Sequence, residues 1–329
     1  MNIYDIAREA GVSITTVSRV INNKENISDK TKLKVESILK KHNYTPNAFA
    51  RGLMSSSIKS IGVITVDIRK QHYAHTAFTI EQDFSKLGYS VILCNTGGKT
   101  TESINYFKML MEKKVDGIIL IGSIFNDQKV KKYVSKYVKN IPIVLANGHL
   151  DVDNGYSVLV DDFDGIYRCV EYLHKKQHTK IVYIKDMETY SAERKKEGFI
   201  AGMNQYGLML DETSISEAVH GLEGGYEAVE KLIATGKEFS AIIFGEDITA
   251  VGGIKKLKEM GWRVPEDVAV TGFDNSIFAK CCEPELTSVD NKVETVASLS
   301  AKMLHDLIEK KEVSSTIMIR PDLIIRKST

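Results

Sequence analysis

The spacing of apolar residues changes at Ser60, and this change divides the 329-residue chain into two kinds of structure. Before Ser60, apolar residues recur every three or four positions in short stretches, which is typical of amphipathic helices. After Ser60, short apolar runs alternate with helical stretches, which is typical of parallel sheets covered by helices on both faces. The sequence therefore predicts a small helical head, residues 1–60, and a larger α/β body.

Three short helices are predicted in the head. Residues 3–10 form the first, and Gly11 supplies a left-handed turn residue after it. Ser13 is a good N-cap for a second helix over Ile14–Ile21, and Ser28 caps a third. Two helices joined by a tight glycine turn, with a third as support, make a helix-turn-helix. The second helix of such a motif can enter the major groove of DNA.

The charge of the chain is unevenly distributed. Residues 1–60 contain 10 Lys/Arg and 5 Asp/Glu, whereas the body contains 34 and 38. A basic module on a slightly acidic body fits phosphate binding. Thr hydroxyls can meet base edges or phosphates, Ile can contact a thymine methyl, and Arg can donate two bonds to guanine. The candidates for these contacts on the second helix are Ile14, Thr15, Thr16, Ser18 and Arg19. Periodicity alone leaves a plain surface helix as an equal alternative.

The head resembles the LacI/GalR family of bacterial transcription regulators. The resemblance is carried by Asp5–Ser13, Thr16–Asn22 and Asn43–Ala48, and it is nearly continuous over residues 3–53. It implies a helix-turn-helix domain over residues 1–45. It also implies that the base-reading positions are Ile14, Thr15 and Arg19, with Thr16 and Ser18 closer to the DNA backbone.

Residues 46–57 have helical spacing after Pro46, but the stretch is shorter than the roughly 12–15 residues that an isolated helix needs in water. Such a segment is expected to fold only against a partner, and the alternative is a linker that never folds. In the resembled family it is a hinge helix, two copies of which lie in the minor groove. There an apolar wedge, here Leu53, kinks the duplex. The DNA-contacting hinge positions would be Asn47, Ala50 and Leu53.

Eight apolar runs predict the strands of the body: Ile61–Val66, Val91–Cys94, Gly117–Ile121, Ile143–Ala146, Ser157–Val160, Ile181–Ile184, Ala241–Phe244 and Val268–Thr271. The region resembles the two-lobed sensor domain of the same family, a relative of periplasmic sugar-binding proteins. The resemblance implies an effector-binding and dimerisation domain over residues 58–329. Its first lobe would take about 58–156 and 290–316. Its second would take about 157–289 and 317–329, with a last strand at Leu323–Arg326.

Ligands of parallel sheets bind beyond the carboxyl ends of the strands. Polar and aromatic residues at those ends are the effector-site candidates: His72, Tyr73, Asn147, Arg194, Lys195, His220, Glu246, Asp247 and Asp274. Carboxylates and amides bond vicinal hydroxyls, and a ring covers the C–H face of a sugar, so the set suits a polyhydroxylated ligand. By the resemblance, Lys195 stands where an arginine is common, His220 where an aromatic residue is common, and Glu246 where asparagine is usual. These departures leave the identity of the ligand open.

Signals for catalysis, metals and membranes are weak. The segment Gly97–Thr100 lacks the first glycine of a phosphate loop, because Leu93 stands there. The four cysteines form no C-x-x-C pair. No apolar run approaches about 18 residues, and no secretion signal begins the chain. We therefore expect a cytoplasmic, non-enzymatic protein without catalytic residues, cofactor, metal or membrane contact.

The resemblance thus implies a homodimeric repressor of carbohydrate-utilisation genes. The protein would bind double-stranded operator DNA and respond to a small-molecule effector, a sugar. Two alternatives stay open. One is a catabolite-type regulator that uses a protein corepressor, and the other is a stand-alone sugar-binding protein.

Overall fold

The computed structural model describes residues 2–21, 27–44 and 57–329. The chain divides into two compact units, one made by residues 1–60 with 114–116 and the other by the remaining residues. Within the described ranges, no helix is long and apolar enough to cross a membrane.

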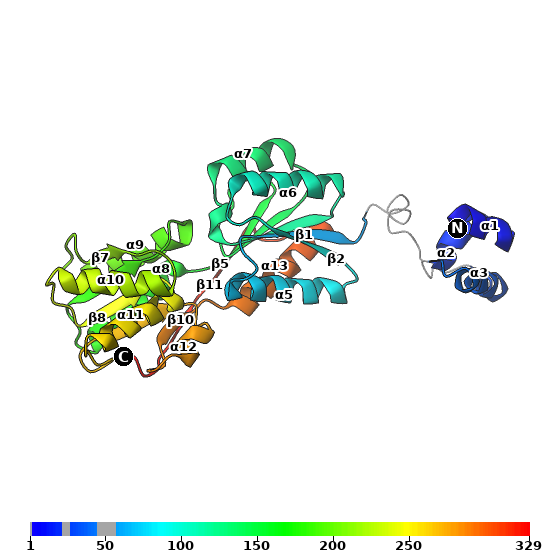
Figure 1. The fold of residues 1–329 in the computed structure, drawn as a ribbon. Coiled ribbons are helices and arrows are strands. Elements are labelled where there is room, and N and C mark those ends of the chain that lie inside the picture. Colours follow the sequence, from blue (N-terminus) through cyan, green and yellow to red (C-terminus); the bar gives the residue numbers. More distant parts are fainter. Residues whose placement is uncertain (1, 22–26, 45–56) are drawn as a thin grey trace. The chain divides into compact units, whose positions relative to one another are not determined.

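The head contains the three predicted helices, α1 (Ile3–Ala10), α2 (Ile14–Ile21) and α3 (Asp29–Lys41) (Figure 1). Their ends follow from local chemistry. Gly11 adopts the left-handed conformation, with φ 66°, directly after α1. The Ser13 hydroxyl accepts a hydrogen bond from the Thr16 amide at 3.1 Å, as an N-cap should. Ser28 caps α3 in the same way through the Thr31 amide.

The head has its own hydrophobic core, to which all three helices contribute. The fully or nearly buried members are Ile6, Ala7, Ala10, Val17, Val20, Val35 and Ile38. Each helix therefore buries one face against the other two, and the opposite faces remain available for contacts outside the head.

Two six-stranded sheets form the body. The first has the order β11-β5-β4-β3-β1-β2 and the second β12-β10-β9-β8-β6-β7. In the second sheet β12 runs antiparallel to β10. The strands of the first are β1 (Ser60–Thr65), β2 (Ser90–Asn95), β3 (Gly117–Ile121), β4 (Ile143–Ala146), β5 (Gly155–Val160) and β11 (Thr316–Ile319). Those of the second are β6 (Ile181–Lys185), β7 (Ile215–Glu217), β8 (Ala241–Phe244), β9 (Ala269–Phe273), β10 (Thr287–Asp290) and β12 (Asp322–Ile324).

Helices cover both faces of each sheet, which gives two lobes. In the first lobe α5 (Gln71–Lys86) and α13 (Val293–Ile308) pack together on one face, with α6 (Thr100–Glu112) and α7 (Gln128–Tyr137) on the other (Figure 1). A short 3-10 helix, Ser123–Phe125, follows β3. In the second lobe α8 (Asp162–Lys175) packs on α9 (Tyr190–Gln205), and α10 (Leu222–Ala234) packs on α11 (Asp247–Glu259). The short α12 (Ile277–Cys281) follows β9.

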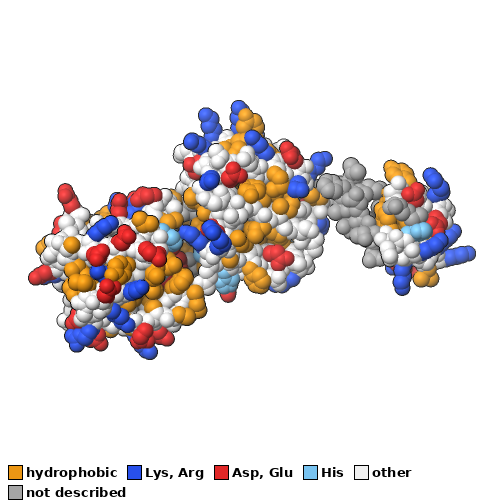
Figure 2. Space-filling model, in the orientation of Figure 1, with side chains coloured by type: hydrophobic (Ala, Val, Ile, Leu, Met, Phe, Trp, Pro, Cys, Tyr) orange, Lys and Arg blue, Asp and Glu red, His pale blue; other side chains and the backbone are white. Residues whose placement is uncertain are grey.

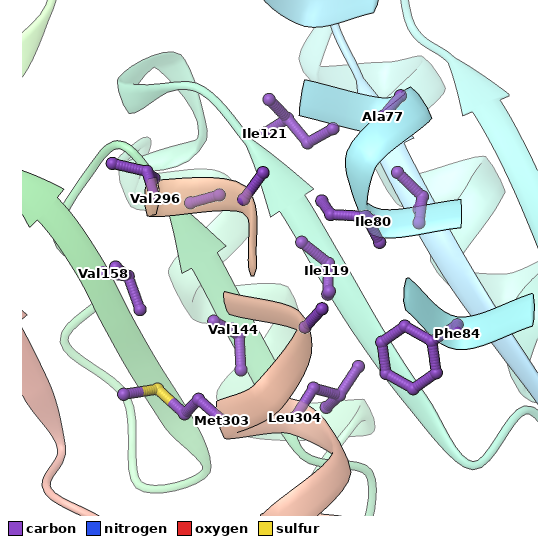
Figure 3. Packing of buried hydrophobic residues seen from close by; sticks show 14 of the residues in the cluster. Ala77, Ile80, Phe84, Ile119, Ile121, Val144, Val158, Val296, Met303 and Leu304 are labelled. Carbon is purple, nitrogen blue, oxygen red and sulfur yellow. The ribbon is translucent and has the colours of Figure 1, made fainter. Parts of the chain in front are cut away.

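The structure corrects two of the expected lobe limits. The run at 157–160 was expected in the second lobe, but β5 pairs in parallel with β4 and β11 of the first sheet. Val158 accordingly lies in the first lobe's core beside Val144 (Figure 3). The expected limit at 316 also falls inside a strand, because β11 runs to Ile319. An apolar run carries no signal for which of two sheets it joins, so the sequence alone does not fix where one lobe ends and the next begins.

Close helix crossings in the second lobe depend on glycine. A Cβ on Gly225 of α10 would overlap the carbonyl oxygen of Thr249 on α11. We predict that Gly225→Ala lowers the free energy of unfolding by about 2 kcal/mol, because the two helices must move apart. Urea denaturation measures this. Glu227→Ala, at an exposed position of the same helix, is the control and should leave the midpoint nearly unchanged. An equal midpoint for both variants would contradict the close-crossing explanation.

Candidate functional site

The predicted DNA-reading positions lie on α2 with different exposures. Thr15 and Arg19 are exposed, whereas Ile14, Thr16 and Ser18 are half-buried. Ile14 also packs against the core of the head. The Thr16 hydroxyl lies 2.9 Å from the Ser13 hydroxyl, so it takes part in the cap of α2. Thr15 and Arg19 are therefore the side chains of this set that are most accessible to a partner.

The head carries exposed basic side chains besides Arg19. Figure 2 shows Lys and Arg side chains projecting from the visible face of the head. Arg8 of α1 and Lys30 and Lys34 of α3 are exposed. The three predicted hinge positions, Asn47, Ala50 and Leu53, lie outside the described residues.

A second candidate site is a cavity of about 1130 Å³ in the body, lined by residues of both lobes. Such a volume is large enough for a small-molecule ligand. Of the predicted effector-site residues, the cavity brings together His72, Tyr73, Asn147, Lys195, His220, Glu246, Asp247 and Asp274. Most of them follow the carboxyl ends of strands, as expected for a parallel sheet.

Arg194, which the sequence also predicts in the effector site, does not line this cavity. Its guanidinium lies 5.1 Å from the Phe163 ring centroid and pairs with Glu197. Arg194 and Lys195 are neighbours on α9, and consecutive side chains of a helix point in directions about 100° apart. Only one of the two can therefore face the cavity.

Lys195 is that residue, and it is 7% exposed. Its Nζ donates a hydrogen bond to the Gly245 carbonyl oxygen at 2.8 Å and lies 3.7 Å from the Phe273 ring centroid. Burial by itself lowers the pKa of an ammonium, but the surrounding carboxylates, Asp162 and Asp274 first among them, raise the pKa of Lys195. The cavity therefore contains a permanent positive charge with one bond already made to the protein backbone.

Asp274 is held in an unusual backbone conformation at the end of β9. Its φ is 105°, a value that residues other than glycine rarely adopt and that is typical of functional sites. The Asn291 side-chain amide donates to Asp274 Oδ1 at 2.7 Å. Burial, reinforced by the Glu246 carboxylate, holds the pKa of Asp274 well above its usual range. The carboxyl group is thus held in one orientation by the backbone and by the Asn291 amide.

Asp247 has a structural role at the wall of the cavity. Its Oδ2 accepts bonds from the Ser276 amide and hydroxyl at 2.7 and 2.8 Å. Its Oδ1 accepts from the Ser288 hydroxyl at 2.6 Å. Burial raises the pKa of Asp247 to about 6. These bonds tie the start of α11 to the segments after β9 and within β10, so little of this carboxylate is left for a ligand.

His72 and Tyr73 face the cavity from the start of α5. Their rings meet edge to face, with centroids 5.3 Å apart. Burial lowers the pKa of His72 to about 4, so its imidazole is neutral at pH 7. Together they provide an aromatic surface of the kind that covers the apolar face of a sugar ring. Asn147 completes this side after β4, with a φ of 59°.

His220 and Glu246 form a charged cluster with Asp186, which the sequence analysis missed. His220 Nδ1 lies 3.1 Å from Glu246 Oε2 and 3.9 Å from Asp186 Oδ2. The two carboxylates raise the pKa of His220 to about 9. Burial opposes ionisation of Glu246, but the adjacent imidazole outweighs it and lowers the pKa of that carboxyl. Asp186 directly follows β6, which is the signal that could have identified it. Other cavity residues missed in the same way are Asp162, Ser191 and Asn291.

Comparison with known proteins identifies the family. Residues 2–47 match the bacterial regulatory proteins of the lacI family, and residues 170–329 match a periplasmic binding protein-like domain. An HTH-type transcriptional regulator of Lachnoclostridium phytofermentans is 37% identical over 331 residues, which cover 100% of this chain and 99% of the relative. The chain belongs to the LacI family. It is a DNA-binding transcriptional regulator, and the family predicted from the head is confirmed.

Other relatives of this LacI-family regulator carry related names. DegA of Bacillus subtilis is 32% identical, covering 99% of this chain and 97% of the relative. Catabolite control protein A of Priestia megaterium is 32% identical, covering 100% and 99%. These relatives are named as regulators of transcription or of catabolite control.

A solved structure confirms the fold. The lac repressor dimer bound to operator and an anti-inducer superposes with a TM-score of 0.89 at 23% identity, covering 100% of this chain and 98% of that one. The predicted architecture, a helix-turn-helix head followed by a two-lobed α/β domain, is therefore confirmed.

Proposed function

We propose that this LacI-family regulator is a homodimeric repressor of carbohydrate-utilisation genes. Its affinity for operator DNA changes when a sugar occupies the cavity of the body. The observation that carries the proposal is the pairing of two features in one chain. One is a basic helix-turn-helix with Thr15 and Arg19 exposed on α2, and the other is a polar cavity lined by both lobes.

Base reading is assigned to α2. Arg19 donates to a guanine, Thr15 meets a base edge, and Ile14 contacts a thymine methyl with the part of its side chain that the core leaves free. Thr16 and Ser18 lie closer to the DNA backbone. The hinge positions Asn47, Ala50 and Leu53 contact the minor groove at the centre of the operator.

Sugar binding is assigned to the cavity. Asp274, Lys195 and Asn147 offer donors and acceptors for hydroxyl groups, and His72 and Tyr73 offer an aromatic surface. The structure of the regulator CelR in complex with cellobiose, at a TM-score of 0.75 and 24% identity, supports this class of ligand. The protein acts by binding rather than by catalysis, and it works in the cytosol, where its operator lies.

Coupling between the two sites is a shift between two states. A ligand can change DNA affinity only by its differential affinity for the DNA-binding and the released state, typically by about 1–3 kcal/mol. Because the cavity is lined by both lobes, a ligand that contacts both favours one lobe orientation over another.

The 32% identity to catabolite control protein A supports a second candidate, a catabolite-type regulator, for which the sequence leaves a protein corepressor open. The two candidates differ in what changes operator affinity. A free sugar does so in the first, and a phosphorylated carrier protein does so in the second.

Fluorescence anisotropy with labelled DNA from upstream of the regulator's own gene tests the proposal. Saturable binding that exceeds binding to shuffled DNA is expected. The affinity should fall by about 10³-fold or more between 50 and 200 mM salt, because a dimer neutralises many phosphates. A panel of mono- and disaccharides should include one that shifts the titration. Equal affinity for both DNAs would refute specific regulation.

We predict that Leu53→Ala lowers operator affinity roughly tenfold and leaves sugar affinity unchanged. An apolar wedge unstacks a base step at some cost in free energy, but the resulting kink lets the DNA contact more of the protein, and the alanine loses this gain. Anisotropy and calorimetry measure the two affinities. Leu33→Ala is the control, since Leu33 is an exposed leucine of α3. Operator affinity equal to that of the unmodified protein would contradict the hinge assignment.

A further inference from the structure

We propose that Asp186, His220 and Glu246 bind a divalent transition-metal cation at the floor of the cavity. The sequence alone predicts no metal site, because its cysteines form no C-x-x-C pair and no cysteine–histidine zinc pattern is present. The inference concerns the body alone and does not depend on which sugar or operator is bound.

The topology brings the three residues together. Asp186 directly follows β6, His220 follows β7 and Glu246 follows β8. These strands are neighbours in the second sheet, in the order β8-β6-β7, and they run parallel, so their carboxyl ends meet. One ligand atom from each side chain lies within 4.8 Å of the other two. This spacing fits three ligands around one ion.

Two polar atoms of the cavity wall lack a well-directed hydrogen bond among the described residues. His220 Nδ1 is buried and pairs with Glu246 Oε2 at 3.1 Å and with Asp186 Oδ2 at 3.9 Å, but neither contact has hydrogen-bond geometry. The Glu246 carboxylate is therefore close but lies off the direction that a hydrogen bond needs. The hydroxyl of Tyr183, which is fully buried in the same cavity wall, also has no hydrogen-bond partner in the described part of the chain.

Asp186 is fixed by its surroundings. The Thr249 hydroxyl donates a hydrogen bond to its Oδ2, and the side chain is 4% exposed. A Cβ at position 245 would overlap its Oδ1, so Gly245 leaves room for the carboxylate. Metal-ligating carboxylates are typically held by such outer hydrogen bonds. The ligand is therefore oriented before an ion arrives.

The donor set selects the kind of cation. One imidazole nitrogen with two carboxylates suits Zn²⁺, Mn²⁺ or Co²⁺, whereas Mg²⁺ and Ca²⁺ prefer oxygen ligands alone. The two carboxylates favour the protonated imidazole of His220, whereas a histidine that binds a metal is neutral. A bound ion would therefore replace that proton. Three protein ligands leave coordination positions open toward the cavity, where hydroxyl groups of an effector can bind.

Cobalt binding to the untagged, full-length protein after chelator treatment tests the proposal. Titration with CoCl₂ should give visible d–d absorption that saturates at one ion per chain, and calorimetry should show weaker binding of MgCl₂. Glu246→Gln and His220→Gln should each weaken Co²⁺ binding by more than about tenfold. His75→Gln is the matched control, because His75 lines the same cavity and pairs with Glu294 outside the cluster.

Two results would overturn the site. One is no saturable binding up to about 1 mM Co²⁺, which corresponds to only about 4 kcal/mol of binding free energy. The other is equal Co²⁺ affinity in Glu246→Gln and the unmodified protein. Operator affinity and circular dichroism of each variant are measured alongside. A failed metal site with intact operator binding would leave the proposed regulator function standing.

Discussion

Arg19→Ala should lower the affinity of the dimer for its operator by about 10²-fold or more. A bidentate arginine–guanine pair contributes roughly 1–3 kcal/mol of discrimination, and a dimer places one such pair in each half-site. Arg19 is exposed on α2 and shares no ion pair among the described residues, so the folded head should tolerate its removal. Anisotropy with the operator and with single-base variants of it gives the affinities.

The specificity of the variant separates two roles for Arg19. A base contact predicts that discrimination relaxes at one base pair of each half-site, while binding to random DNA changes little. Arg8→Ala removes an equal charge from the exposed surface of α1 and serves as the control. An equal loss on operator and on random DNA would show that Arg19 contacts phosphates only.

Asp274→Ala should weaken sugar binding by about 10²-fold and remove the sugar response, while operator binding is retained. A buried polar group that loses its hydrogen-bond partner costs about 1–3 kcal/mol, and Asp274→Ala removes the partner of the sugar hydroxyl and of the Asn291 amide. Calorimetry measures the affinity, with the sugar that raises the melting temperature most in a screen of mono- and disaccharides.

A matched control comes from α9, outside the cavity. Arg194→Ala should leave sugar affinity unchanged, because Arg194 pairs with Glu197 and does not line the cavity. Asp274→Asn should keep part of the affinity, since the amide can still donate and accept. An unchanged affinity in Asp274→Ala would remove this residue from the sugar site.

Features set by local chemistry were predictable from the sequence. Gly11, Ser13 and Ser28 mark the ends of the head helices at the residues where the structure has them. The apolar runs at Ile143–Ala146 and Ala241–Phe244 coincide with β4 and β8. Caps, turns and fully buried strands depend on residues that are close together in the chain. They can therefore be predicted from the sequence without knowledge of the tertiary structure.

Features set by pairing between distant segments were not predictable. β7, β10 and β11 are short, and β7 and β11 are largely exposed or half-buried, so none forms a long apolar run. β5 could not be assigned to a sheet, because its apolar run suits either one. The sequence therefore indicated two parallel sheets but not their edges or the limit between them.

The cavity residues likewise divide into those that the sequence predicts and those that it does not. Strand-end residues such as Asp274 and His220 were predictable, because parallel sheets place their ligand sites there. The choice between Arg194 and Lys195 needed the orientation of α9. The cluster of Asp186 with His220 and Glu246 needed the order of three strands, which is a property of the sheet and not of any one segment.

The order of segments in the first lobe has a consequence for synthesis of the protein. α13 and β11 belong to this lobe, yet they come from residues 293–319, near the end of the chain. α13 covers a face of the first sheet that includes Val144 and Val158 (Figure 3), and during translation this face stays uncovered until the strands β6–β10 of the second lobe have been made. Exposed apolar surface on a nascent chain favours aggregation, so the first lobe is vulnerable until residues 293–319 have been synthesised.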